Sequence, residues 1–153
     1  MSSKQRWISH GFEITCGNAE VIRCEVIIDA HNREVIAWRT AADAHISSSD
    51  ICDLMREAAA KHFGDRRADQ QVELLCDYGS AYVTWDACAV ACQLGFKLCF
   101  APVSGPERKG ISESFMRTLV LIPFRDAPPP SAETTHGLLS SWFENFSIDP
   151  STP

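Results

Sequence analysis

Two carboxylates are the residues of this chain whose types and positions best suit chemistry. Asp77 directly follows a short apolar segment typical of a strand, and residues 78–80 (YGS) predict a turn after it. Sites in α/β proteins form where strands end, so we expect Asp77 at the edge of a sheet. Glu113 lies on a predicted helix, off its apolar face. Taken singly, Asp77 would more often form a turn and Glu113 would more often be a solvated helix residue, so their interpretation depends on the surrounding sequence.

The elements that must position these acids follow from hydrophobic periodicity. Residues 7–38 predict three consecutive strands with short turns, since apolar and polar residues alternate and β-branched residues recur. Beyond them the spacing predicts a helix at 51–63, a strand at 72–76, a helix at 84–94, a strand at 96–100 and a helix at 111–119. This order predicts an α/β, ribonuclease H-like fold: a five-stranded mixed sheet of three antiparallel strands, then alternating helices and strands, with helices on both faces.

The chain is 153 residues long, which is enough for one domain with a real core. We expect this core to span residues 7–122. The segment 126–131 (DAPPPS) can hold neither a helix nor a central strand, so residues 123–153 are predicted to be a degraded C-terminal extension. One helix, from about residue 131 to about residue 146, is expected within it.

Composition bounds the class of protein. With 45% hydrophobic and 22% charged residues, the chain has the composition of an ordinary soluble globular protein. No apolar run approaches the roughly 20 residues that span a bilayer, and the polar N-terminus lacks the apolar segment of a signal peptide. We therefore expect a cytoplasmic protein with no membrane partner.

Cysteines and tryptophans offer a second kind of candidate site. The seven cysteines are odd in number, irregularly spaced and without a C-x-x-C pair, so we expect them to be reduced and mostly buried. Cys88 and Cys92 lie one helical turn apart, which keeps a zinc protein unrelated to the two acids open as an alternative. The four tryptophans are expected in the core or at an interface.

The net charge of −6 bears on nucleic-acid binding. Proteins that bind DNA usually carry a basic surface, because neutralising phosphates releases counterions and drives the association. Either the basic residues of this chain are concentrated locally, or the chain binds DNA poorly.

Five segments, in order, match the pattern of one protein family. Residues 75–82 (LCDYGSAY) are similar to a T-D-N-G-S-x-Y element, residues 105–115 (GPERKGISESF) to S-P-x-S-N-G-x-x-E-x-F, residues 7–13 (WISHGFE) to W-x-x-D-G-F-E, residues 26–38 (VIIDAHNREVIAW) to V-x-x-D-x-x-x-R-E-x-x-x-W, and residues 141–146 (SWFENF) to W-F-E-x-Y-N. The chain therefore resembles the insertion-sequence transposases of the second-reading-frame type, whose integrase catalytic core belongs to the Asp-Asp-Glu, retroviral-integrase superfamily.

This resemblance makes Asp77 and Glu113 the second and third acids of the signature, which the family separates by 35 residues, as here. It implies DNA cleavage and strand transfer at insertion-sequence ends, that is, DNA recombination and integration. Two Mg²⁺ (or Mn²⁺) ions about 3.5–4 Å apart would be held by three carboxylates, since hard cations prefer charged oxygen ligands. Lys109 and Arg117 flank Glu113 and could bind DNA phosphates, although a solvated face that pairs with Glu113 is the alternative.

The resemblance breaks down at the first acid, whose position is taken by His10. That acid would bridge both metal ions, and a neutral imidazole carries no charge to offset them, so we predict a degenerate and catalytically defective site. Asp29 is the nearest spare acid, but the family carries an acid there as well, which makes it a poor replacement. The chain begins at the core, so we expect a truncated member that lacks the family's N-terminal DNA-binding part.

Two functions stay open. The chain is a transposase subunit that other chains complement in trans, or it is a non-catalytic remnant that binds DNA or interferes with a full-length transposase. Homo-oligomers or mixed oligomers with that transposase would be the partners in either case. The loss of the first acid and the acidic net charge favour an inactive catalytic-core fragment.

Overall fold

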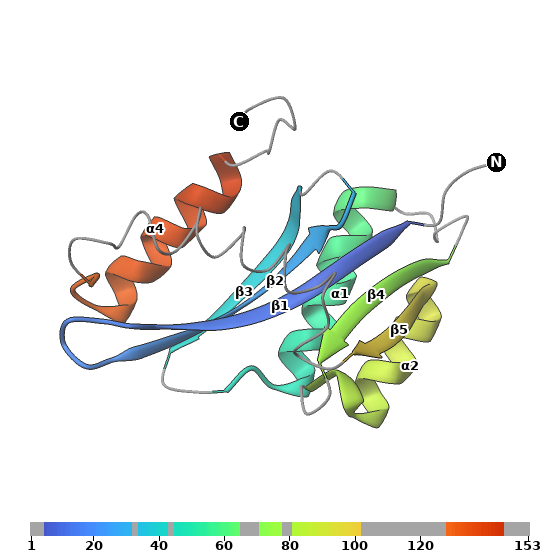
Figure 1. Ribbon diagram of the computed structural model, residues 1–153, viewed down its shortest axis with the longest axis horizontal. Coiled ribbons are helices and arrows are strands. Elements are labelled where there is room, and N and C mark those ends of the chain that lie inside the picture. The colour runs from blue at the N-terminus through green and yellow to red at the C-terminus, as the bar shows by residue number, and fades with distance from the viewer. Residues whose placement is uncertain are drawn as a thin grey trace.

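The computed structural model describes residues 5–31, 34–42, 45–64, 71–77, 81–101 and 128–145. In chain order its elements are β1 (Arg6–Thr15), β2 (Val21–Asp29), β3 (Val35–Ala42), α1 (Ser48–Phe63), β4 (Val72–Asp77), the 3-10 helix η1 (Ala81–Val83), α2 (Trp85–Leu94), β5 (Phe96–Ala101) and α4 (Ala132–Asn145) (Figure 1). The order agrees with the sequence-based expectation. The helix predicted at residues 111–119 lies outside the described residues.

The five strands form one mixed sheet in the order β3-β2-β1-β4-β5. The first three strands pair antiparallel, as a meander, whereas β4 pairs parallel to β1 and β5 pairs parallel to β4. The predicted ribonuclease H-like α/β architecture is therefore confirmed. β1, the first strand in the chain, becomes the central strand because β4 adds to its free side.

Helix boundaries follow from capping residues. The Ser47 side chain accepts a hydrogen bond from the backbone N–H of Asp50, and the Asp50 carboxylate accepts one from the backbone N–H of Ser47. This cap starts α1 at Ser48, three residues before the start that apolar periodicity alone predicted. Gly64, with φ of 65°, ends it. Thr84 caps α2, and Gly95 ends that helix in the left-handed conformation with φ of 87°.

The sheet has a hydrophobic core on each face. Helices α1 and α2, which lie side by side in Figure 1, cover one face, where Trp7, Leu54 and Leu74 are fully buried. The opposite face carries a second core that includes Phe12 and Ile14. Because side chains alternate along a strand, Trp7 of β1 enters the first core while Phe12 and Ile14 enter the second.

Helix α4 closes the second core over β2 and β3 (Figure 1). Its Leu139 and Phe143 are buried, and the Phe143 ring centroid lies 5.1 Å from that of Trp38. Thr135 forms a 3.2 Å contact with the thiol of Cys16. The predicted helix in the C-terminal extension is present and packs on the sheet, while the boundary between residues 122 and 123 stays a prediction.

Among the described residues, no helix is long and apolar enough to span a membrane. Four of the seven cysteines are buried, as expected, and Cys88 and Cys92 are exposed. Trp7 lies in the core, whereas Trp85 is 86% exposed.

Candidate active site

His10 and Asp77 lie on neighbouring parallel strands. The register of β1 and β4 pairs Trp7 with Leu74 and Ile8 with Leu75. Continuing this register by two residues brings His10 level with Asp77. Asp77 is the last residue of β4 and pairs with Ala101 at the end of β5, so it lies at the carboxyl edge of the parallel strands, where the sequence predicted it.

The two positions also belong to the same face of the sheet. His10 pairs with Val26, and it has the same strand parity as Phe12 and Ile14, which enter the second core. On β4, Leu74 and Cys76 enter the first core, so position 77 has the opposite parity. Both positions therefore fall on the face opposite α1 and α2. The fold therefore brings together two of the three positions that the sequence resemblance assigned to a metal site.

His10 is a partly buried aromatic residue in this environment. Its ring stacks on Phe12 with centroids 6.1 Å apart and an interplanar angle of 27°, and its Nε2 atom is buried from solvent. The sheet therefore holds position 10 on a regular strand, and the residue there presents a nitrogen donor of borderline softness in place of a charged oxygen.

A chain of buried polar groups runs beneath His10 on the other face of β1. The Tyr82 hydroxyl donates to Ser9 Oγ at 2.7 Å, and Ser9 Oγ donates to Glu25 Oε1 at 3.3 Å. All three residues are less than 10% exposed. These two hydrogen bonds link η1, which follows Asp77 by a few residues, to β1 next to His10, and β1 to β2. They fix the spacing of the strands on which the candidate site lies.

Glu25 was not singled out from the sequence. The available signal was an acid in the middle of a strand rich in β-branched and apolar residues (VIRCEVIID), at a position with the parity of the buried Ile27. Burial raises the pKa of Tyr82 well above its ordinary value, and the nearby Glu25 carboxylate adds to the increase while the Ser9 hydrogen bond opposes it.

Asp29 lies away from positions 10 and 77. It pairs with Trp7 on β1, about 10 Å along the strand from His10, and shares the face of Trp7 rather than that of His10. Its Oδ1 accepts the backbone N–H of His31 at 2.8 Å, so it supports the turn after β2. This geometry agrees with the sequence-based expectation that Asp29 is a poor replacement.

Glu113, Lys109 and Arg117 lie outside the described residues, so their catalytic, metal-binding and DNA-binding assignments stay predictions. Within the described ranges, no group of three or more histidine, cysteine or acidic side chains gathers to hold a metal ion. An imidazole at position 10 beside a carboxylate at position 77 also does not make the set of charged oxygen donors that Mg²⁺ prefers. In the same part of the chain, no third ligand joins Cys88 and Cys92 for zinc.

Comparison with known proteins identifies relatives of the chain by sequence. No protein-family model matches the chain. Over 95% of its length it is 44% identical to an uncharacterized protein of insertion element IS136 from Agrobacterium fabrum, of which it covers 75%. It is 33% identical, over 94% of its length, to the InsD transposase of insertion element IS2D from Escherichia coli, and it spans 48% of that protein, about half.

Solved structures show the same fold at low sequence identity. The catalytic domain of Mos1 mariner transposase is similar with a TM-score of 0.69, at 13% identity, over 92% of this chain and 70% of that one. The catalytic core domain of BIV integrase is similar with a TM-score of 0.56, at 15% identity, over 90% of this chain and 83% of that one. Mos1 catalytic-domain structures with Mg and with Mn are among the similar chains.

Proposed function

This chain belongs to the insertion-sequence transposases with an integrase-type catalytic core, and on that premise we propose that it is a catalytic-core fragment whose ancestral role was DNA cleavage and strand transfer, now inactive. Its substrate class would be the DNA ends of an insertion sequence. Mg²⁺ or Mn²⁺ would be the family's cofactor, and Asp77 and Glu113 the two acids that remain. A cytoplasmic location belongs to the same proposal.

The observation that carries the proposed inactivity is the residue at position 10. His10 lies on β1, level with Asp77 by register and on the same face, where the family's motif has its first acid. Two divalent cations concentrate four positive charges, and a neutral imidazole leaves the site with one fewer compensating negative charge. The strand positions the residue, but its chemistry does not suit the metal ions.

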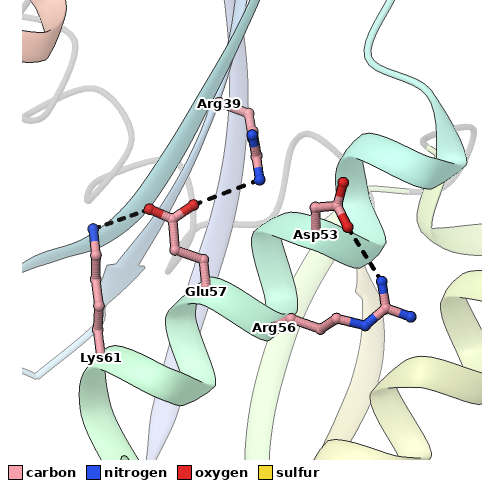
Figure 2. A network of polar contacts seen from close by, with 5 residues as sticks. All are labelled: Arg39, Asp53, Arg56, Glu57 and Lys61. Carbon is pink, nitrogen blue, oxygen red and sulfur yellow. Dashed lines mark hydrogen bonds and ion pairs between the residues drawn. The ribbon is translucent and has the colours of Figure 1, made fainter.

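Weak DNA binding is part of the proposal, and the exposed charges of α1 support it. Figure 2 shows that basic groups on this helix are matched by acids: Lys61 Nζ lies 3.1 Å from Glu57 Oε1, and Arg56 Nη1 lies 3.2 Å from Asp53 Oδ1. Arg39 of β3 also approaches Glu57, at 3.8 Å. A surface whose cations are paired with carboxylates attracts phosphates weakly, in keeping with the net charge of −6.

The test is a nicking assay on the purified chain with oligonucleotides that carry insertion-sequence ends, in Mg²⁺ and in Mn²⁺. We expect no metal-dependent nicking above the level of an Asp77→Ala variant. Robust nicking that Asp77→Ala abolishes would contradict the proposed inactivity and would favour an active subunit.

Interference with a full-length transposase is the second candidate function. What favours it is a packed five-stranded core in a chain whose first acid is lost, because a folded but inactive core can still enter oligomers. Coexpression with a full-length relative should lower its transposition frequency. An unchanged frequency at high expression of the fragment would count against interference.

A further inference from the structure

Helix α2 presents an apolar stripe to solvent. Trp85, Cys88, Ala89 and Cys92 follow the i, i+3, i+4, i+7 spacing of one helix face, and all four are exposed. Trp85 is 86% exposed and Val83, just before the helix, is 50% exposed. The buried residues of α2, Ala87, Val90 and Ala91, lie on the opposite side. We call the four exposed residues the α2 stripe.

The α2 stripe inverts the usual pattern of a surface helix. Such a helix normally buries its apolar face and shows polar residues to water. Helix α2 is apolar on both sides, and its largest side chain, Trp85, lies on the exposed one. Exposed apolar surface of this kind marks interaction sites, and tryptophan is typical of their centres.

We propose that the α2 stripe binds the α2 stripe of a second copy of this chain, with the two helices antiparallel about a two-fold axis between residues 88 and 89. Such an axis places Trp85 opposite Cys92 of the second copy, and Cys88 opposite Ala89. Each large indole then lies over a small side chain, and the small residues at the centre let the helices approach closely. The spacing of the stripe is thus self-complementary in shape.

Charge selects the antiparallel arrangement. Asp86 and Gln93 are exposed and flank the stripe on the same side. In the antiparallel pair, Asp86 lies near Gln93 of the second copy, whose amide can donate to the carboxylate. In a parallel pair the two-fold axis would instead run along the helices and place Asp86 and Gln93 of the second copy on opposite sides of the contact, so this hydrogen bond could not form. Antiparallel helices also bring the positive end of each dipole to the negative end of the other.

The surface area that the two stripes can bury predicts a weak dimer. A tryptophan buries about 150–250 Å² at an interface, so the two stripes with their flanking residues would bury roughly 600–800 Å² in total. Stable interfaces bury about 1,200–2,000 Å². We therefore expect a dissociation constant on the order of 10–100 µM. The inference does not rest on the proposed function, because it involves neither His10 nor Asp77.

Sedimentation equilibrium of the whole chain, from about 1 µM to about 1 mM, tests the association. We expect a monomer at the lower end and a dimer at the upper end. Trp85→Glu should weaken the dimer by at least about tenfold, since it removes the largest apolar side chain of the contact and places a charge against Cys92 of the second copy. The matched control is Leu138→Glu. Leu138 is a 42% exposed apolar residue on α4, outside the α2 stripe, so this variant should leave the dissociation constant unchanged. A monomer throughout, or equal effects of the two variants, would overturn the proposal.

Thiol cross-linking tests the register even if a Trp85 variant does not fold. The two-fold axis places Cys88 within about 2 Å, along the helix axis, of Cys88 in the second copy, whereas the two Cys92 residues are about 10 Å apart in the same direction. With a short bismaleimide, Cys92→Ser should therefore give cross-linked dimer at least about five times faster than Cys88→Ser. Equal or reversed rates would exclude this antiparallel pairing.

Discussion

Gly11 lies directly against the carboxylate of Glu25. A Cβ atom at position 11 would come within 2.5 Å of Glu25 Oε2, on the strand pair that joins β1 to β2. Glu25 is buried and its other carboxylate oxygen accepts from Ser9, so it has little room to move. The glycine next to His10 is thus required by packing on the face opposite the candidate site.

Gly11→Ala should therefore destabilise the fold. Because the new methyl group must displace a buried, hydrogen-bonded carboxylate, we expect a loss of about 1–3 kcal/mol in the free energy of unfolding, measured with urea. Gly137→Ala is the matched control: position 137 lies in α4 with nothing within 4 Å of the added Cβ, so alanine should stabilise by about 0.5–1 kcal/mol. The Gly11→Ala cost should shrink when Glu25→Ala is added, and an undiminished cost would disprove the contact.

Tyr82→Phe should change how stability depends on pH. Burial raises the pKa of Tyr82 in the folded chain above its unfolded value. As pH rises, the unfolded chain therefore loses the phenolic proton before the folded chain does. The contribution of Tyr82 to the free energy of unfolding is fully present below about pH 10 and is lost as pH rises above it. The phenylalanine variant should be about 1 kcal/mol less stable at neutral pH, because Ser9 loses its donor, and its stability should fall less steeply above about pH 10. Urea unfolding at several pH values measures the free energy of unfolding of the parent chain and of the variant. If that free energy depends on pH in the same way for both, the raised pKa of Tyr82 is contradicted.

Leu139→Ala and Leu138→Ala should have very different costs. Leu139 is 1% exposed within the core between α4 and the sheet, whereas its neighbour Leu138 is 42% exposed. We expect the first to cost about 2–5 kcal/mol and the second less than about 1 kcal/mol of unfolding free energy. Similar costs for the two variants would mean that α4 does not pack as described, and that the C-terminal extension contributes little to the fold.

His10→Asp should increase metal affinity. A carboxylate at this position restores a charged oxygen ligand on the face it shares with position 77. We expect the dissociation constant for Mn²⁺, measured by calorimetry, to fall by roughly tenfold or more, an electrostatic gain of a few kcal/mol or less. Adding Asp77→Ala should remove the gain. If His10→Asp alone leaves the affinity unchanged, more than the first ligand has been lost.

Several features were accessible from the sequence alone. The order of strands and helices was predicted correctly because strand alternation and helical spacing are local properties of consecutive residues. The placement of Asp77 at the end of β4 followed from the same local chemistry. The sequence also determined that position 10 holds a histidine, and with it the prediction of a defective site.

Only the tertiary structure decided which of these residues meet. The pairing of β1 with β4 joins segments more than 60 residues apart, and no local pattern encodes its register. Continued two residues beyond Ile8 and Leu75, that register sets His10 level with Asp77. The burial of Glu25 and the exposure of Trp85 were likewise decided by what packs against each element. Helix α2 is apolar on two sides, so its periodicity could not distinguish the face that meets α1 and β5 from the one that meets water. Periodicity defines the faces of an element, but burial depends on the neighbour that covers each face.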